Sequence, residues 1–187
     1  MKPLEELSLS ELGRLFPISL VDSDPAWPEI YRKESESIVE VLGTLNVFRI
    51  THIGSTSVPG LIAKPTIDIL LEIPHETNPD TVRVKLLAAG YLYNEQPDNP
   101  PPHMMFMKGY TPEGYRGQAF HVHVRYPGDW DEPIFADYLR KHKDVRDEYA
   151  ETKRRCCDKY KDDREAYTQM KTECIRRITE VARKSER

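Results

Sequence analysis

Residues 52–73, HIGSTSVPGLIAKPTIDILLEI, hold the combination that decides the fold. A β-branched stretch ends at a glycine with hydroxyl residues behind it, and a Pro-Gly turn then leads into a strongly apolar strand. Asp68 is the one aspartate among the Ile and Leu residues of that strand. Burying a carboxylate without a partner is costly, so Asp68 must face a cation, a metal ion or several hydrogen-bond donors.

The quoted stretch includes the end of one predicted strand and all of a second, and a predicted helix precedes both. Residues 47–54 are β-branched and extended, and residues 66–73 form a second strand that reads as buried on both faces. Upstream, apolar residues recur with helical spacing after the capping Asp24 and stop at Gly43. They are Trp27, Tyr31, Ile38 and Val41.

The middle of the chain predicts a further helix and a hairpin. Residues 79–89 fit a helix that Gly90 closes. Residues 103–110 and 118–126 flank a turn-rich segment and predict a β-hairpin. The four prolines within residues 93–105 predict a long loop, which we interpret as a lid over the site.

The two ends of the chain read as helical. Residues 1–16 predict a short N-terminal arm that stops at Pro17, and residues 134–184 carry two apolar stripes of helical period. The order of elements predicts a mixed β-sheet covered by helices, an α/β (α+β) fold. A chain of 187 residues suits a single domain, 1–187.

Composition narrows the class of protein. The formal net charge is −4, which does not favour nucleic acid, and the basic run KRRCCDKYK (153–161) is interrupted by an acid and reads as a solvated helix face. No apolar run approaches the ~18 residues of a membrane span, and the N-terminus is too polar for a signal peptide. Cys156, Cys157 and Cys174 fit reduced thiols packed in helices, so we expect a cytoplasmic protein.

Gly54, Ser55 and Thr56 suit a bound phosphate. A glycine turn at a strand end offers backbone N–H groups and two hydroxyls, and Lys64 follows as a counter-charge. The alternative is an ordinary turn with an exposed lysine.

A second constellation lies on the strand FHVHVRY (120–126). His121, His123 and Arg125 share one face, and the two histidines project ~7 Å apart. Such a pair can bind one metal ion, flank an anion or move a proton. A histidine alone would more often be a satisfied core residue, and Asp68 itself has the alternative of an internal Arg or Lys partner.

Glu34 and Lys171 lie on the apolar stripes of two separate helices. Charged side chains aimed inward predict an internal polar network, which we extend to Arg49. The alternative is that both side chains snorkel at the edges of their stripes.

Five segments of the chain carry a resemblance to a known family. They are DPAWPEIYRKE, HIGSTSVPGLIAKPTIDILLEI, FHVHV, YLRKHKDVRDEYAETK and YTQMKTECI. Together they resemble the GrpB family, which is grouped by fold with the DNA polymerase beta-like nucleotidyltransferases. The resemblance runs from about Leu15 to Ala182 and implies a mixed sheet in which the Gly54 turn lies beside the Asp68 strand.

The resemblance also implies a metal site, but the residues of this chain differ from the nucleotidyltransferase pattern at two of its positions. Active nucleotidyltransferases carry Gly-Ser, an Asp-x-Asp pair and a third carboxylate that together hold Mg²⁺. Here Gly54-Ser55 and Asp68 match, but the second carboxylate position is Leu70 and the later strand supplies histidines. Glu72 stands ~13 Å along the strand from Asp68, too far to share an ion with it.

Two functional hypotheses follow. In the first, the chain is a nucleotidyltransferase-type enzyme. Asp68, His121 and His123 hold a divalent ion, for which Mn²⁺ or Zn²⁺ suits better than Mg²⁺, and a histidine is ligand or general base. Ser55 and Thr56 bind phosphates, with Lys64 or Lys171 offsetting their charge.

In the second hypothesis, the chain binds a nucleotide or anion without transfer chemistry. Ser55, Lys64, His121 and Arg125 would then supply the affinity. Both hypotheses expect a small-molecule or nucleotide ligand, no nucleic acid and no membrane.

Overall fold

A computed structural model describes residues 4–96, 98–99, 101–160 and 164–185 of the chain. Eleven helices and strands make up its regular structure, with short 3-10 turns at Leu4–Glu6 (η1), Thr44–Asn46 (η2) and Ser55–Ser57 (η3). The helices are α1 Leu9–Leu15, α2 Trp27–Leu42, α3 Pro79–Ala88, α4 Asp131–Lys141, α5 Lys143–Lys159 and α6 Arg164–Ser185. The strands are β1 Arg49–Ile53, β2 Thr66–Glu72, β3 Leu92–Asn94, β4 Met104–Thr111 and β5 Gly114–Arg125.

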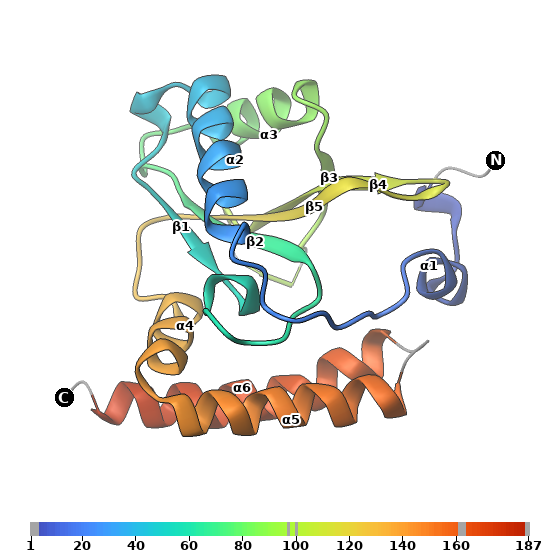
Figure 1. Ribbon diagram of the computed structural model, residues 1–187. Helices are drawn as coiled ribbons and strands as arrows, with labels where there is room; N and C mark the ends of the chain where they lie inside the picture. Colours follow the sequence, from blue (N-terminus) through green and yellow to red (C-terminus); the bar gives the residue numbers. More distant parts are fainter. Residues whose placement is uncertain (1–3, 97, 100, 161–163, 186–187) are drawn as a thin grey trace.

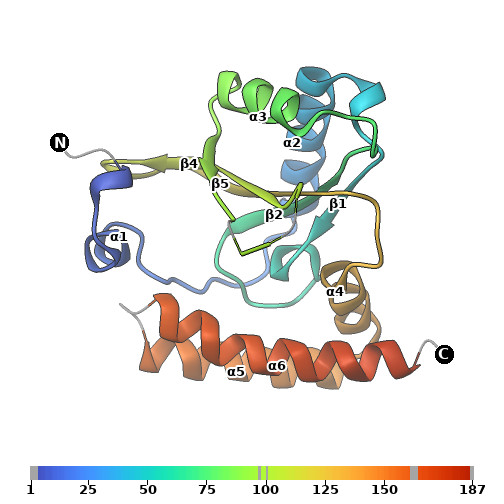
Figure 2. The same ribbon diagram turned by 180° about the vertical axis from the view of Figure 1, so that it is seen from behind.

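The five strands form one mixed sheet in the order β1-β2-β5-β4-β3. The β2 and β5 strands run parallel, and every other neighbouring pair is antiparallel. The α2 and α3 helices lie on one side of this sheet and the last three helices lie on the other (Figures 1 and 2). The predicted mixed sheet covered by helices is confirmed.

The apolar face of the sheet forms the main core with α2 and α3. Ile67, Ile69 and Leu71 of β2 are fully buried there beside Trp27 and Ile38, two residues of the predicted α2 stripe. Each such side chain contributes roughly 1.5–3 kcal/mol by leaving water. Because side chains alternate along a strand, Asp68, Leu70 and Glu72 must face the opposite side.

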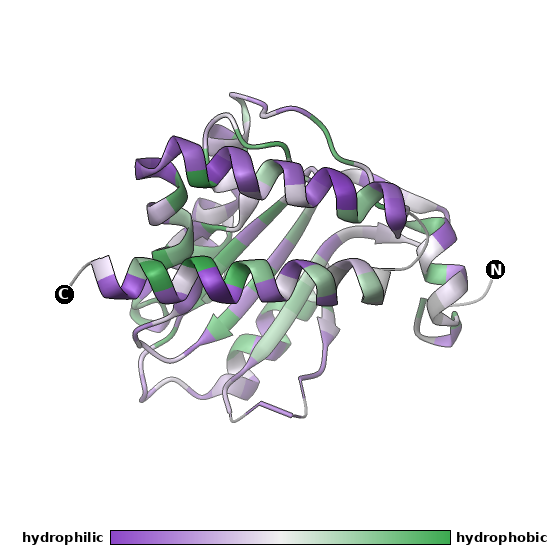
Figure 3. Cartoon of the chain, turned by 90° about the horizontal axis from the view of Figure 1, so that it is seen from below, coloured by the Kyte–Doolittle hydropathy of each residue, from purple (hydrophilic) through white to green (hydrophobic). Residues whose placement is uncertain are grey.

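The three C-terminal helices cover this second, more polar side. They pack against the segment after η3 through Val58, Leu61 and Ile62, which join the apolar faces of α4 and α5. The α5 and α6 helices run side by side beneath the sheet, α5 made mostly of hydrophilic residues and α6 of hydrophilic and hydrophobic residues in alternation (Figure 3). The Val-Pro-Gly-Leu-Ile part of the opening motif therefore anchors the site loop to the helical layer.

The structure differs from the predicted elements in two places. The predicted loop 93–105 is shorter, because Leu92–Asn94 forms a strand paired with β4 and β4 itself begins at Met104. Three helices rather than two follow the sheet, since His142 has extended backbone and separates α4 from α5. A three-residue strand is too short to show alternation, and one extended residue does not interrupt a periodic pattern.

The described part of the N-terminal arm is helical at Leu9–Leu15, and this helix ends two residues before Pro17. Ser8 and Glu11 form a capping box at its start, which satisfies backbone donors of the first turn. Phe16 then anchors the arm, with its ring centroid 5.0 Å from those of both Tyr110 and Tyr115.

The three cysteines are unbonded thiols on α5 and α6, and Cys156 is buried against Ile18 and Tyr167 as the packing interpretation predicts. Among the helices of the described residues, none is both long and apolar enough to cross a membrane.

His52 supplies a measurable pH dependence of stability. Its ring stacks on Tyr31 at 4.7 Å and its Nε2 lies 3.0 Å from the Thr56 hydroxyl, and burial lowers the pKa of His52 from 6.5 to about 4. Between these values the unfolded chain binds more protons than the folded one. Stability therefore rises with pH through this window and is lost as pH falls from 6.5 towards 4.

We expect His52→Gln to flatten this dependence. The shift corresponds to no more than about 3 kcal/mol, and partial exposure of the ring lowers the effect. Urea unfolding of both proteins at pH 4.5, 5.5 and 7 measures the difference in slope. If the unfolding free energies of wild type and variant changed with pH to the same extent, a neutral, buried His52 would be contradicted.

Candidate metal and phosphate site

Asp68 and Gly54 are held against each other by strand pairing. Ile53, the last residue of β1, pairs with Asp68 of β2, so the next residue turns directly over the carboxylate. Gly54 has φ +71°, and a Cβ built there would lie 2.5 Å from the Asp68 Oδ2. Only a glycine permits both this left-handed backbone and this approach. The Gly54 turn and the Asp68 strand lie side by side, as the family resemblance implies.

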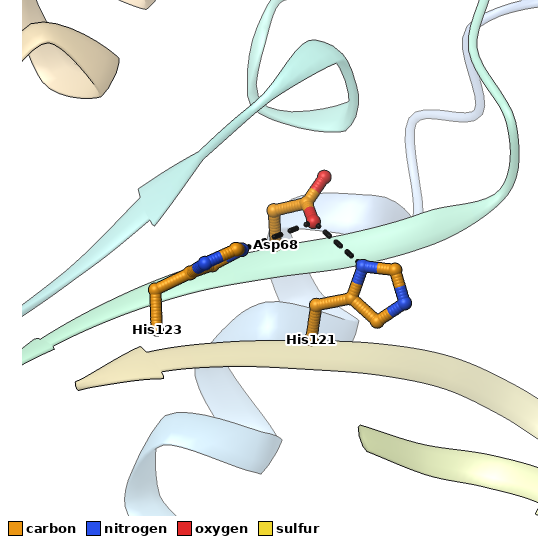
Figure 4. A group of neighbouring side chains, drawn as sticks. All are labelled: Asp68, His121 and His123. Carbon is orange, nitrogen blue, oxygen red and sulfur yellow. Dashed lines mark hydrogen bonds and ion pairs between the residues drawn. The ribbon is translucent and has the colours of Figure 1, made fainter. Parts of the chain in front are cut away.

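Two histidines of β5 complete a cluster with Asp68. In the parallel pairing of β2 and β5, Asp68 is opposite His121 and Leu70 is opposite His123, so all these side chains share one face. The His121 Nδ1 lies 3.2 Å from the Asp68 Oδ1, and the His123 Nε2 lies 3.7 Å from the same oxygen (Figure 4). The three side chains are 16–27% exposed, so a ligand can reach them.

The charge states of this cluster suit metal binding. Burial opposes ionisation of Asp68, but the hydrogen bonds from the two imidazoles outweigh it and hold the pKa of Asp68 well below its usual range. Burial lowers the pKa of His121 and the Asp68 carboxylate only partly offsets this. Asp68 is therefore ionised and His121 neutral near pH 7, the forms in which both groups bind a metal ion.

The donor set fits one transition-metal ion. Among the described residues, Asp68, His121 and His123 form the one group of three His, Cys, Asp or Glu side chains whose ligand atoms lie within 4.8 Å of one another. Two ligands each ~2.1 Å from one ion stand at most ~4.2 Å apart, so small side-chain rotations close the set. Two imidazoles with one carboxylate favour Mn²⁺, Zn²⁺ or Fe²⁺ over Mg²⁺.

Tyr110 supports this cluster and was not predicted. Its hydroxyl lies 2.7 Å from the His121 Nε2, the ring nitrogen that points away from Asp68. A metal-binding histidine commonly engages a partner through its second nitrogen, which fixes its tautomer and ring orientation. The register shift between Lys108 and Tyr110, a β-bulge, brings the Tyr110 hydroxyl to His121. Gly109, which adopts φ +87° in this bulge, was the one residue in the sequence that could have indicated it.

The second carboxylate of an Asp-x-Asp pair is missing. Leu70 occupies its position and is fully buried. The Glu72 carboxylate, two residues further along, is ion-paired with Arg49 and accepts a hydrogen bond from the Gly128 N–H at 3.2 Å. The carboxylate of Glu72 is thus engaged away from Asp68.

Two cavities meet at the cluster. The larger has a volume of about 740 Å³ and is lined by His123 and Arg125, and the smaller has about 180 Å³ and is lined by His121 and Lys64. Ser55, Asp68 and Lys171 line both, so the predicted hydroxyl and lysine stand at the junction beside the carboxylate.

Burial lowers the pKa of Lys171, and the charge of Asp68 partly offsets that effect. Burial likewise lowers the pKa of Arg125, with Glu132 opposing. Both cations therefore sit in partly dehydrated surroundings, where their attraction for an anion is stronger than in bulk water. Asn99 and His103 of the 93–105 segment line the larger cavity.

Three predicted site residues lie elsewhere. Thr56 is buried with its hydroxyl 3.0 Å from the His52 Nε2 and donating to the Thr66 carbonyl, so it supports the turn and faces away from the cavities. Glu34 accepts hydrogen bonds from Tyr91 and Lys108 on the α2 side of the sheet.

Arg49 pairs with Glu72 on the opposite side of the sheet from Glu34. The predicted network of Glu34, Lys171 and Arg49 is therefore wrong, because the sheet separates Glu34 from the other two.

One further lysine, Lys153, reaches the smaller cavity from α5. The sequence predicts a solvated face for the basic run that begins with it. That prediction is wrong for Lys153, which is 1% exposed, although its neighbours Arg154 and Arg155 are exposed.

Comparisons with known proteins give a family match and a shared fold. A family model described as GrpB protein matches residues 17–181. A UPF0157 protein of Pseudomonas aeruginosa is 42% identical over 145 residues, which cover 76% of this chain. The aligned region is 58% of that relative's length.

Two solved structures share the fold. A crystal structure of the conserved protein GrpB from Enterococcus faecalis superposes with a TM-score of 0.77 at 28% identity, covering 90% of this chain and 99% of that one. The Cid1 poly(U) polymerase, in a crystal structure with MgGTP bound, superposes with a TM-score of 0.51 at 11% identity. That match covers 81% of this chain and 47% of Cid1, and it shows a nucleotidyltransferase-like fold.

Replacing Gly54 tests the close approach to Asp68. Gly54→Ala should cost about 2–4 kcal/mol of stability, because the left-handed backbone alone costs about 1–2 kcal/mol and the methyl group must also displace the carboxylate. Gly90→Ala is the matched control, since Gly90 has φ +85° and nothing within 4 Å of a built Cβ. Chemical denaturation of both variants checks this. Equal losses of stability in Gly54→Ala and Gly90→Ala would show that the Asp68 carboxylate does not restrict the side chain at position 54.

Proposed function

The chain belongs to the GrpB family, and from that premise we propose that it is a metal-dependent enzyme of nucleotidyltransferase type acting on a phosphate-bearing small molecule. One observation carries this proposal. Asp68 converges with His121 and His123 within 4.8 Å beside the Gly54-Ser55 turn, although the aspartate and the two histidines come from separate strands. Three titratable groups gathered beside a cavity are typical of a functional site.

Each site residue has a role in this proposal. Asp68, His121 and His123 hold a divalent ion, which when bound supplies a Lewis acid that offsets the charge of phosphate oxygens. Ser55 donates its hydroxyl to a phosphate oxygen, and Lys171 provides a counter-charge from α6 at the same junction.

The second set of contacts lies in the two cavities. Lys64 binds the anionic part of the ligand in the smaller cavity, and Arg125 orients its remaining part in the larger one. If Asp68 and His121 alone hold the ion, His123 is placed to accept a proton from a hydroxyl bound in the larger cavity.

The cavity supports a small molecule as the ligand. A volume of about 740 Å³ lies within the range of ~300–1,000 Å³ that is usual for small-molecule sites. The structure of Cid1 was solved with MgGTP bound, so a nucleoside triphosphate is the first ligand to try. Cid1 is a poly(U) polymerase, but a net charge of −4 gives this chain no general attraction for RNA.

A second candidate is binding without transfer. Leu70 at the second carboxylate position favours it, because a two-metal mechanism needs a ligand there. In that case Ser55, Lys64, His121 and Arg125 bind the ligand and no ion is required.

Thermal unfolding separates the two candidates. Melting temperatures are compared for the apo protein with Mg²⁺, Mn²⁺ or Zn²⁺, each with and without nucleoside triphosphates and EDTA. A ligand at ~100 times its Kd adds ~2.7 kcal/mol to stability. Stabilisation that needs metal and nucleotide together supports the enzyme, whereas nucleotide binding that persists in EDTA supports the binding protein.

Replacing Asp68 tests the proposed metal site. Asp68→Asn should abolish stabilisation by Mn²⁺ or Zn²⁺ and any turnover, because the amide is a poor metal ligand. The isosteric amide fills the same space, so the stability of the apo protein should change by no more than about 1 kcal/mol. A large loss of apo stability with metal stabilisation retained would instead mark Asp68 as a structural residue.

Replacing Tyr110 tests the support of His121. Tyr110→Phe removes the hydroxyl at Nε2 and should weaken metal binding by roughly 10- to 100-fold, measured by calorimetric titration. Tyr115→Phe is the matched control, since it removes a hydroxyl from the same aromatic cluster, where the Tyr115 ring centroid lies 5.2 Å from that of Tyr110. Equal affinity of all three proteins would show that Tyr110 does not orient the ligand.

A further inference from the structure

The smaller cavity is the most cationic part of the site. Lys64, Lys153 and Lys171 all line it, and Asp68 is the one carboxylate among its lining residues. These lysines come from the loop before β2, from α5 and from α6, so only the assembled fold brings them together. When all three amines are protonated, the three lysines outweigh the one carboxylate and the lining carries a net positive charge that suits an anion.

Lys153 is the residue that makes this arrangement unusual. Its side chain is 1% exposed, its Nζ donates to the Ile62 carbonyl, and the amine lies 5.5 Å from the centroid of the Tyr149 ring. Burying a lysine without an acidic partner is costly, and here burial lowers the pKa of Lys153 well below its usual value. Packing alone does not explain a lysine at this position.

Thr66 gives an independent indication of a ligand. Thr66 is among the residues that line the smaller cavity, and it is 4% exposed. Within the part of the chain that the structure describes, its buried hydroxyl has no hydrogen-bond partner. Such groups are rare in folded proteins, and an acceptor bound in the cavity would satisfy this one.

The size of the cavity limits what it can hold. A volume of about 180 Å³ is below the ~300–1,000 Å³ of sites that enclose a whole drug-sized molecule. It suits a compact group to which the Ser55 and Thr66 hydroxyls and the three lysine amines can all donate hydrogen bonds. A group that uses such a set is a tetrahedral oxyanion with more than one negative charge.

We propose that Lys153 and Thr66, with Lys64, Lys171 and Ser55, form a binding pocket for a phosphate or pyrophosphate oxyanion. The pocket adjoins His121, so in turnover it holds the terminal phosphates of the substrate while the remainder occupies the larger cavity. This role in turnover rests on the proposed function, but binding of the oxyanion itself requires no metal ion.

Calorimetric titration of the full chain with inorganic pyrophosphate and inorganic phosphate, in EDTA at ~0.15 M salt, tests the pocket. Wild type should bind pyrophosphate, and Lys153→Met should weaken that binding at least about tenfold, as expected for loss of a charged donor. Lys159→Met, an exposed lysine of the same helix outside the pocket, is the control for net charge and should change Kd less than about twofold. Thr66→Val should weaken binding about three- to tenfold while keeping side-chain shape.

Equal pyrophosphate affinity in wild type, Lys153→Met and Thr66→Val would overturn the proposal. A loss in Lys159→Met as large as in Lys153→Met would also overturn it, by showing a general effect of charge. Circular dichroism and melting temperature establish that each variant folds, and Thr66→Val tests the pocket if Lys153→Met does not fold.

Comparison with the metal experiment separates the two proposals. If pyrophosphate binding depends on Lys153 but no metal ion stabilises the protein, the oxyanion pocket is supported and the metal-dependent enzyme is contradicted. If a metal ion binds but pyrophosphate binding is unchanged in Lys153→Met and Thr66→Val, only the oxyanion pocket is contradicted.

Discussion

Asp68 lies in an interior strand with its carboxylate against the Gly54 turn on one side and the His121 imidazole on the other. The other residues of the site are arranged so that this carboxylate keeps its position and its hydrogen bond. A residue with a side chain at position 54 would strike the carboxylate, and a strand without His121 would leave it without its hydrogen bond. Tyr110 in turn engages the far nitrogen of His121. The order of strands in the sheet, with β5 beside β2, is what brings these residues together.

The polar face that carries Asp68 also explains the layer of helices beneath it. An apolar face can be covered by close packing, as α2 and α3 cover theirs, but a face with a carboxylate and two imidazoles needs polar partners and space. The α5 and α6 helices supply Lys153 and Lys171 to that space while their apolar residues pack on the segment after η3. The C-terminal helices thus contribute two lysines to the site, and the strands and the segment between β1 and β2 contribute the other residues proposed to bind the metal ion or the ligand.

Much of this arrangement could be predicted from the sequence, because the signals are local. Alternation in FHVHVRY places His121 and His123 on one face, and the apolar run around Asp68 marks an interior strand. What could not be predicted depends on contacts across the fold. Lys153 begins a basic run yet is buried, since α6 and the site loop cover that turn of α5. The contact between Tyr110 and His121 depends on a β-bulge. Glu34 and Arg49 lie on opposite sides of the sheet, and the spacing of residues along a helix does not show which side of the sheet the helix covers.

The most direct test of the metal site is anomalous diffraction from crystals of the wild-type protein soaked in Mn²⁺, with Asp68→Asn crystals treated in the same way. We expect one anomalous peak in the wild type, ~2.0–2.3 Å from an Asp68 carboxylate oxygen, the His121 Nδ1 and the His123 Nε2. The Asp68→Asn crystals should show no peak there. A peak at another position, or none in wild-type crystals at millimolar Mn²⁺, would contradict a metal-dependent function for this cluster of side chains.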